Sequence, residues 1–211
     1  MKLKSYVCIL LACCLSWAAV DVASQEREAQ PQPALVTPRE EMSKILDQLV
    51  DIAEAHPGDK NLEVRKTEMR KVIEPKFDFQ QMSQLSLGSQ WSSLSAQDRA
   101  EFVKVFSDLL AKTYLSKISV VTRGMVRISG DRVRENRALV RTMVTFKGDE
   151  FPLDYKLVNR GGEWKVYDVI IENIGLVVNY RNEFAGIIRK EKFDGLMKRL
   201  REKLAKPEES K

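Results

Sequence analysis

The chain has 211 residues, 44% of them hydrophobic and 31% charged, with a formal net charge of +5. This length and balance are ordinary for one globular domain and exclude a disordered or collagen-like chain. The single histidine is His56, and the three cysteines are Cys8, Cys13 and Cys14. A metal site built from several histidines is therefore excluded, and so is thiol chemistry beyond the N-terminus. A binding function is favoured over catalysis.

The N-terminus has the pattern of a secretory signal peptide. Lys2 and Lys4 precede an apolar run, Tyr6–Val20, and small residues follow at Val22-Ala23-Ser24. We expect cleavage after Ser24, which makes residues 1–24 a signal peptide and exports the mature chain. A retained membrane anchor and a lipoprotein acylated at Cys13 are the alternatives.

Helical patterns fill the first half of the mature chain. After a flexible lead-in over 25–36, Thr37 caps a helix, Pro38 occupies its first turn and Glu40 completes a capping box. That helix ends at His56-Pro57-Gly58. Further helices are predicted over 62–73, over 77–85 and from a Ser95 cap to about residue 118, with Trp91 in a loop.

The pattern changes to strands after Arg123. Turn signals at Gly130-Asp131, Lys147-Gly148-Asp149 and Gly161-Gly162 separate apolar runs at hairpin spacing. The four predicted strands are Met125–Ser129, Ala138–Phe146, Phe151–Val158 and Trp164–Glu172. Short turns between consecutive strands indicate an antiparallel meander.

The chain then returns to helix. One helix is predicted over 176–189 and another from a cap near Asp194 to Pro207. The order of elements predicts an α+β fold with helices on one face of a curved antiparallel sheet. We expect a single domain over 37–205 and a charged tail over 206–211.

Few residues offer catalytic chemistry. Asp168 lies in an aromatic strand and could act as a base, and Asp78 lies between two phenylalanines. No partner base or nucleophile is evident, so a structural hydrogen bond or ion pair is favoured for Asp168 and a helix N-cap for Asp78. No phosphate loop or metal-ligand spacing is present, so we expect no cofactor, no metal and no enzyme activity.

Two basic features leave a binding role open. Tyr180-Arg181 fits either an anionic ligand or a packing anchor with a surface arginine. The basic residues after Arg189 are interleaved with acidic ones, which favours a solvated helix face. Dispersed charge on an exported chain also argues against nucleic-acid binding.

An apolar set could face a space between the helices and the sheet. Periodicity alone favours an ordinary packed core for these residues, because composition does not separate a filled core from a cavity. The candidate lipid-contacting residues are Met82, Leu85, Leu109, Leu110, Tyr114, Met143, Tyr155, Leu157, Ile171, Leu176, Tyr180 and Phe184.

Two groups of motifs resemble the MlaC family, also called the toluene-tolerance family. The first group comprises Pro75-Lys76-Phe77-Asp78-Phe79, Leu87-Gly88-x-x-Trp91, Phe102-x-x-x-Phe106 and Leu109-Leu110-x-x-Thr113-Tyr114. The second comprises Tyr155-x-Leu157, Trp164-Lys165-Val166-Tyr167-Asp168-Val169, Ile171-Glu172 and Asn179-Tyr180-Arg181-x-x-Phe184. The resemblance extends from about Leu35 to Leu204.

The resemblance implies a periplasmic carrier of phospholipid. Its partners would be an outer-membrane lipoprotein complex and an inner-membrane ABC transporter bearing an MCE domain. The implied fold is a strongly bent four-stranded antiparallel sheet wrapped by helices, with lipid tails in an apolar pocket between them. One departure is Asn173-Ile174-Gly175, where the family usually has Gly-Val-Ser. Without that serine, a polar contact at the turn and the identity of the lipid are in doubt.

Three other functions remain open. A carrier of hopanoid-type lipids would share the fold. A periplasmic adaptor would have the same elements around a filled core. An enzyme of similar shape would need a polar pocket with Asp168 or another acid at its base.

Overall fold

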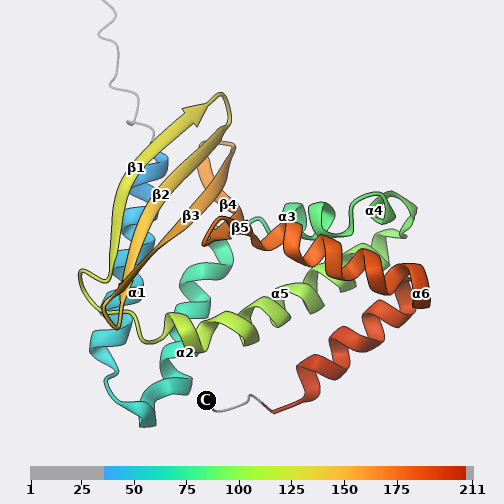
Figure 1. Ribbon diagram of the computed structural model, residues 1–211, viewed down its shortest axis with the longest axis horizontal. Coiled ribbons are helices and arrows are strands. Elements are labelled where there is room, and N and C mark those ends of the chain that lie inside the picture. The colour runs from blue at the N-terminus through green and yellow to red at the C-terminus, as the bar shows by residue number, and fades with distance from the viewer. Residues whose placement is uncertain (1–35, 208–211) are drawn as a thin grey trace, which may run out of the picture. The chain divides into compact units, whose positions relative to one another are not determined.

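The computed structural model describes residues 36–207, and its helices and strands confirm the α+β class (Figure 1). The predicted signal peptide, the lead-in up to residue 35 and the tail from residue 208 lie outside the described residues. The elements, in chain order, are α1 (Pro38–Ala55), η1 (Asp59–Asn61), α2 (Leu62–Ile73), η2 (Glu74–Lys76), α3 (Phe79–Leu87), α4 (Gln90–Ser93), α5 (Ala96–Ile118), β1 (Val126–Arg134), β2 (Arg137–Phe146), β3 (Asp149–Arg160), β4 (Glu163–Ile171), β5 (Ile174–Gly175) and α6 (Leu176–Ala205).

Local capping sets where the helices begin. The Thr37 hydroxyl accepts a hydrogen bond from the Glu40 amide at 3.2 Å, and the Thr37 amide donates to the Glu40 carboxylate at 2.8 Å. The Ser95 hydroxyl accepts from the Asp98 amide at 3.1 Å at the start of α5. The predicted starts of both helices are therefore confirmed.

The sheet is antiparallel and has five strands in the order β1-β2-β3-β4-β5. The sequence predicted four. The additional strand, β5, is two residues long and pairs Gly175 with Ile170 and Ile174 with Ile171. A strand of that length carries no alternating pattern, which is why the sequence does not reveal it.

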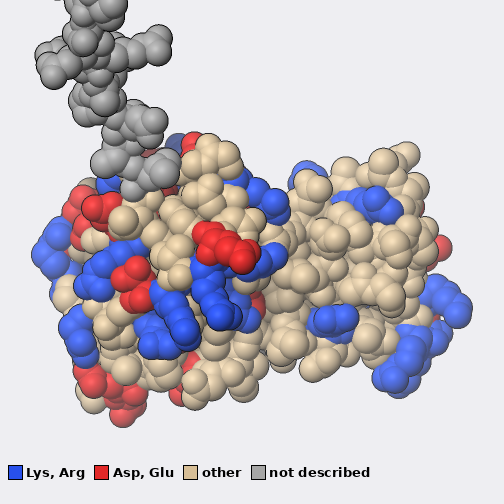
Figure 2. Space-filling view, turned by 90° about the horizontal axis from the view of Figure 1, so that it is seen from above, with Lys and Arg blue, Asp and Glu red and all other residues tan. Residues whose placement is uncertain are grey.

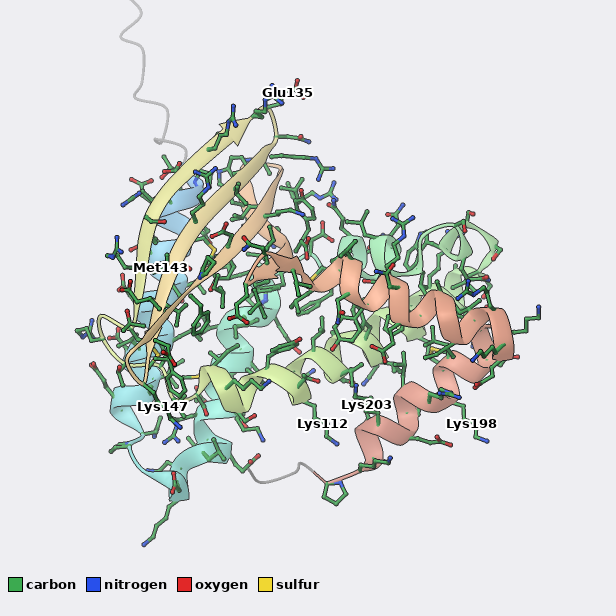
Figure 3. All side chains as sticks on the ribbon, viewed as in Figure 1. Lys112, Glu135, Met143, Lys147, Lys198 and Lys203 are labelled. Atoms are coloured by element: carbon green, nitrogen blue, oxygen red, sulfur yellow. The ribbon has the colours of Figure 1, made fainter. Side chains whose placement is uncertain are left out.

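The first hairpin turns later than predicted. β1 continues through Gly130-Asp131, where the register shifts between Ile128 and Gly130, and the chain reverses only at Glu135, whose φ is +52°. Figure 3 shows Glu135 at the tip of this hairpin, at the opposite end of the sheet from Lys147. A glycine inside a strand often marks a bulge rather than a turn, and this glycine does so.

Two helical predictions need correction. Trp91, predicted in a loop, lies in the one-turn helix α4. The two late helices form one element, α6, interrupted only at Lys192, where φ is +62° and ψ is −172°. Beyond this kink α6 folds back alongside α5 (Figure 1).

Buried apolar residues form two clusters, and α5 contributes to both. The first cluster joins α1, α2 and the sheet, and contains Met42, Ile45, Leu49, Val50, Met69, Leu115, Val121, Ala138, Val140, Leu157, Trp164, Val166 and Val169. The second joins α3, α5 and α6, and contains Met82, Leu87, Phe102, Val105, Phe106, Leu109, Leu110, Val177, Tyr180, Phe184, Leu196, Met197 and Leu200. Over residues 36–207, no helix is long and apolar enough to cross a membrane.

Charges of both signs are mixed on the face that Figure 2 shows. Lysine and arginine side chains alternate there with aspartate and glutamate over the end of the molecule that carries the sheet. On this face no continuous basic surface forms of the kind that a nucleic-acid backbone requires.

Candidate functional site

A cavity of about 600 Å³ lies between the sheet and the helices, beside the first cluster. This volume is within the range of roughly 300–1,000 Å³ that ligand pockets occupy. Helix α1 provides Met42, Ile45, Leu46 and Leu49; α5 and the segment after it provide Ser107, Leu110, Ala111, Tyr114, Leu115, Lys117, Ile118, Val120, Val121 and Met125; the strands provide Val126, Val144, Phe146, Phe151, Leu153, Tyr155, Val169 and Ile171. The remaining wall comes from Arg70, Ile73, Glu74, Phe77, Phe79, Met82 and Leu176.

The regular spacing of these residues along each strand and helix directs their side chains into the cavity. Residues of a strand alternate between faces, so Leu153 and Tyr155 of β3 point to the same side. On α5, Ala111, Tyr114 and Ile118 follow helical spacing and form one stripe. Ala111 is the smallest of them and leaves space open beside the sheet.

Most polar groups in the wall already have partners. Arg70 donates to Glu74 at 2.6 Å and to Asp108 at 2.5 Å, and Ser107 donates to the Lys104 carbonyl at 2.9 Å. Lys117 lies 5.6 Å from the centre of the Tyr114 ring. The space they leave is suited to a hydrocarbon chain rather than to a polar substrate.

Tyr114 connects the cavity with the second cluster. Its side chain lines the cavity, and its hydroxyl interacts with that of Tyr180, which is buried among the aromatic residues of α5 and α6. Burial is the main cause that raises the pKa of Tyr114 above its ordinary value, so the phenol stays neutral.

Half of the candidate lipid-contacting residues lie in the cavity wall. They are Met82, Leu110, Tyr114, Tyr155, Ile171 and Leu176. They come from α3, α5, β3, β4 and α6, so the fold brings together side chains that are far apart in the sequence.

Four other candidates belong to the second cluster instead. Leu109, Tyr180 and Phe184 are buried there, and Leu85 packs against it. The Phe106 ring lies 5.1 Å from that of Tyr180 and 5.5 Å from that of Phe184, both edge to face. Adjacent residues of a helix point about 100° apart, so Leu110 reaches the cavity wall while Leu109, its neighbour in the same cluster, does not.

The last two candidates, Leu157 and Met143, are also outside the wall. Leu157 is fully buried in the first cluster, just after the register shift between Lys156 and Leu157. Met143 of β2 lies on the opposite sheet face from its buried neighbours Thr142 and Val144. The alternation of the strand therefore directs Val144, rather than Met143, into the cavity.

Helix α1 and the segment after α5 line the cavity although their sequences did not predict it. Met42, Ile45 and Leu49 formed a clear helical stripe, but such a stripe does not say whether it meets a filled core or a void. The segment 120–125 has no periodic pattern at all.

Both candidate acids have structural partners. Asp168 is 4% exposed, and its carboxylate accepts hydrogen bonds from the Val177 amide and from Lys156, each at 3.0 Å. Asp78 caps α3 by accepting from the Gln81 amide at 2.8 Å, and it also binds Arg160. Among residues 36–207, no group of three or more potential ligand side chains could hold a metal ion.

The Tyr180-Arg181 pair serves packing in this structure. Tyr180 is buried in the second cluster, and the Arg181 guanidinium lies close to Gly88, where a Cβ atom would come within 3.1 Å of it. Gly88 has a φ of +57° and follows α3 directly. The arginine therefore packs against the end of α3.

Comparison with known proteins assigns the family. Residues 43–202 match the MlaC protein family. The chain belongs to this family. A curated relative, "Intermembrane phospholipid transport system binding protein MlaC" of Haemophilus influenzae, is 22% identical over 148 residues, which are 67% of this chain and 69% of the relative.

A solved structure shares the fold. It is the phospholipid-binding protein from Ralstonia solanacearum in complex with a phospholipid, which is 25% identical with a TM-score of 0.71. The match covers 78% of this chain and 95% of the other. The α+β arrangement of this MlaC family member is therefore that of a known lipid-binding protein.

Proposed function

We propose that this protein binds phospholipid for an intermembrane transport system and holds the acyl chains in the cavity between the sheet and the helices. The observation that carries the proposal is the apolar wall of that cavity, about 600 Å³ in volume. The names of the Haemophilus relative and the Ralstonia structure support the same cargo.

A carrier is physically necessary for such a cargo. Two chains of about 16 carbons would cost on the order of 24 kcal/mol to expose to water, at about 0.8 kcal/mol per methylene group. An apolar cavity replaces the membrane interior with an environment of similar quality. Loading and unloading are then nearly balanced, and partner proteins can set the direction.

The proposal also states where the protein acts and between which complexes it carries lipid. The signal peptide over residues 1–24 exports the chain to the periplasm, where residues 37–205 form the lipid-binding domain. The carrier moves lipid between an outer-membrane lipoprotein complex and an inner-membrane ABC transporter with an MCE domain, whose ATPase supplies the energy. The two register shifts in β1 and β3 fit a sheet that bends around the lipid.

The lipid-contacting residues follow from the wall. We assign this role to Met82, Leu110, Tyr114, Tyr155, Ile171 and Leu176, together with the α1 residues opposite them. Methionine side chains such as Met42 and Met82 adapt to chains of different length. No catalytic residue is part of the proposal.

Native mass spectrometry with a cavity-filling variant tests the proposal. Residues 25–211 are purified from a periplasm without detergent as the natural chain, as A111W and as A100W. Ala111 lines the cavity, whereas Ala100 is exposed on the same helix. The natural chain and A100W should carry a mass matching a phospholipid, and A111W should carry little or none.

The alternatives give different spectra. A bound hopanoid would show that the protein is a lipid carrier with a cargo other than phospholipid. A bare mass for the natural chain, unchanged after incubation with phospholipid vesicles, would overturn the carrier and favour the adaptor. Equal lipid on all three proteins would place the lipid outside the cavity.

A further inference from the structure

One polar side chain in the cavity wall, that of Tyr155, makes no hydrogen bond with any residue that the structure describes. Tyr155 of β3 pairs with Val140 of β2 and Val169 of β4, and both valines are buried. Tyr155 nevertheless keeps accessible surface and is part of the cavity wall. Its side chain is therefore directed into the void rather than into the packed core.

The hydroxyl of Tyr155 makes no hydrogen bond with any residue from 36 to 207. Within the same range, the fully buried side-chain atoms without a partner are Arg65 Nε, Ser83 Oγ and Ser86 Oγ. The Tyr155 hydroxyl is not among them, so it retains surface that a molecule in the cavity can touch. The cavity's other tyrosine, Tyr114, has Tyr180 as its partner.

The hydroxyl is also a permanent donor. Burial is the main cause that raises the pKa of Tyr155 above its ordinary value, and the nearby Asp154 adds to it. The phenol therefore keeps its proton throughout the physiological range. Because no described protein group accepts from it, an acceptor on the ligand must take over this hydrogen bond once a lipid has displaced water from the cavity.

We propose that the Tyr155 hydroxyl determines specificity by donating a hydrogen bond to an acceptor oxygen on the acyl part of the bound lipid. In an ordinary diacyl phospholipid the oxygens of this kind are the ester carbonyls. A hydroxyl group along the acyl chain would offer the same chemistry. The inference rests on the proposed function and names the chemical feature that the cavity selects.

The physical reason is the cost of an unpaired polar group. A site built to hydrogen-bond a ligand rejects an analogue that lacks the matching atom, because the buried group then stays unsatisfied. A lipid with ether-linked chains has the same hydrocarbon but no carbonyl. It should therefore bind less well than its ester counterpart, and only while the Tyr155 hydroxyl is present.

The test measures competition between paired lipids for displacement of a fluorescent fatty acid. The pairs are phosphatidylethanolamine with ester or ether linkages, and a fatty acid with or without a mid-chain hydroxyl. The proteins are the natural chain, Y155F and Y167F. Tyr167 lies on the same sheet outside the cavity wall, with Arg137 stacked over its ring at 4.9 Å, so Y167F is the matched control.

The natural chain and Y167F should prefer the oxygen-bearing member of one pair by about fivefold to tenfold, as expected for one net hydrogen bond. Y155F should lose that preference and still bind all the lipids. The pair that shows the effect identifies the acceptor as an ester carbonyl or a chain hydroxyl. Thermal unfolding of the delipidated proteins checks that Y155F is folded.

The test distinguishes a failure of the role proposed for Tyr155 from a failure of the proposed lipid binding. If Y155F keeps the same preference ratios as the natural chain, or the natural chain has no preference in either pair, the role of Tyr155 is overturned while lipid binding stands. If the natural chain binds none of the lipids, the proposed function itself fails, and the inference with it.

Discussion

Asp168 is a buried carboxylate that holds two elements together. It accepts one hydrogen bond from the amide of Val177 in the first turn of α6 and another from Lys156 on the neighbouring strand. Because Gly175 at the N-cap of α6 has no side chain to offer, Asp168 of β4 caps this helix. A negative charge at a helix N-terminus is favourable.

The same contact accounts for a glycine at the start of α6. A Cβ atom on Gly175 would lie 3.0 Å from the Asp168 carboxylate, so the glycine lets the carboxylate approach the helix closely. A serine at this position could have capped α6 itself. In this chain the cap comes from the strand rather than from the turn.

Replacing Asp168 should therefore reduce stability. D168N keeps one acceptor oxygen but loses the charge-assisted bonds to Val177 and Lys156, and we expect about 1–3 kcal/mol less free energy of unfolding. Urea unfolding followed by circular dichroism measures the change. D149N, at an exposed position in β3, is the control and should change little.

Lipid binding separates this structural role from a catalytic one. Folded D168N should bind phospholipid as the natural chain does, because Asp168 is not part of the cavity wall. The result that would contradict the structural role has two parts. D168N would be as stable as the natural chain, and the natural chain would turn over a small substrate that D168N does not, which would restore the enzyme alternative.

The starts of α1 and α5 and the end of α2 were predictable because their signals are local. The Thr37 and Ser95 caps and the stop before Pro75 each depend on residues within one turn. The hairpin at Glu135 and the strand β5 depend on pairing with other strands, which one sequence does not display. The bulge at Gly130 therefore resembled a turn.

The cavity wall was half predictable for a related reason. Apolar periodicity finds the buried face of each element, but it does not say which neighbour that face meets. Leu109 and Leu110 are both buried in the second cluster, yet only Leu110 also lines the cavity. Tyr155 was correctly placed on the face of Leu153, and Met143 was placed on the wrong face of β2.

Helix α6 contains a backbone strain at its kink. Lys192 has φ +62° and ψ −172°, a region that is essentially reserved for glycine and costs of order 1–3 kcal/mol for other residues. The kink allows the last part of α6 to return along α5, where Lys112 donates to the carbonyl of Leu204 at 2.7 Å. Figure 3 shows Lys112 beside the same end of α6, near Lys203.

Glycine at the kink should stabilise the protein. K192G removes the strain, and we expect a gain of about 1 kcal/mol after the greater flexibility of glycine in the unfolded chain is deducted. K190G, two residues earlier within the helix, should instead lose about 1 kcal/mol. Chemical denaturation of both variants measures the difference. An equal loss in both would mean that α6 is not kinked at Lys192.

Across the whole molecule, packing and binding are divided only in part between the two clusters. The second cluster contains the packed aromatic rings of α5 and α6 and supplies only Met82 and Leu110 to the cavity wall. The first cluster supplies more of the wall, namely Met42, Ile45, Leu49, Leu115, Val121 and Val169. Helix α5 is common to both, so the filled cluster can hold one wall of the cavity rigid. Tyr114, whose hydroxyl interacts with that of Tyr180, lies at the junction.

This division predicts how a lipid changes stability. A ligand that binds only the folded state stabilises it by about 2.7 kcal/mol at a free concentration of 100 times its Kd. For a chain of this size, roughly 2–4 °C per kcal/mol is expected, so phospholipid should raise the Tm of the delipidated protein by about 5–10 °C. Differential scanning calorimetry with and without short-chain phospholipid below its micelle concentration measures the shift.

The cavity-filling variant A111W tests whether the rise in Tm comes from lipid bound in the cavity. In A111W the added indole occupies space that the chains need, so the lipid-dependent rise in Tm should disappear, while A100W should keep it. Filling the void should also leave delipidated A111W at least as stable as the natural chain, since the side chains lining a void lack contacts on one side. The same rise in A111W as in the natural chain would show that lipid stabilises the fold from outside the cavity.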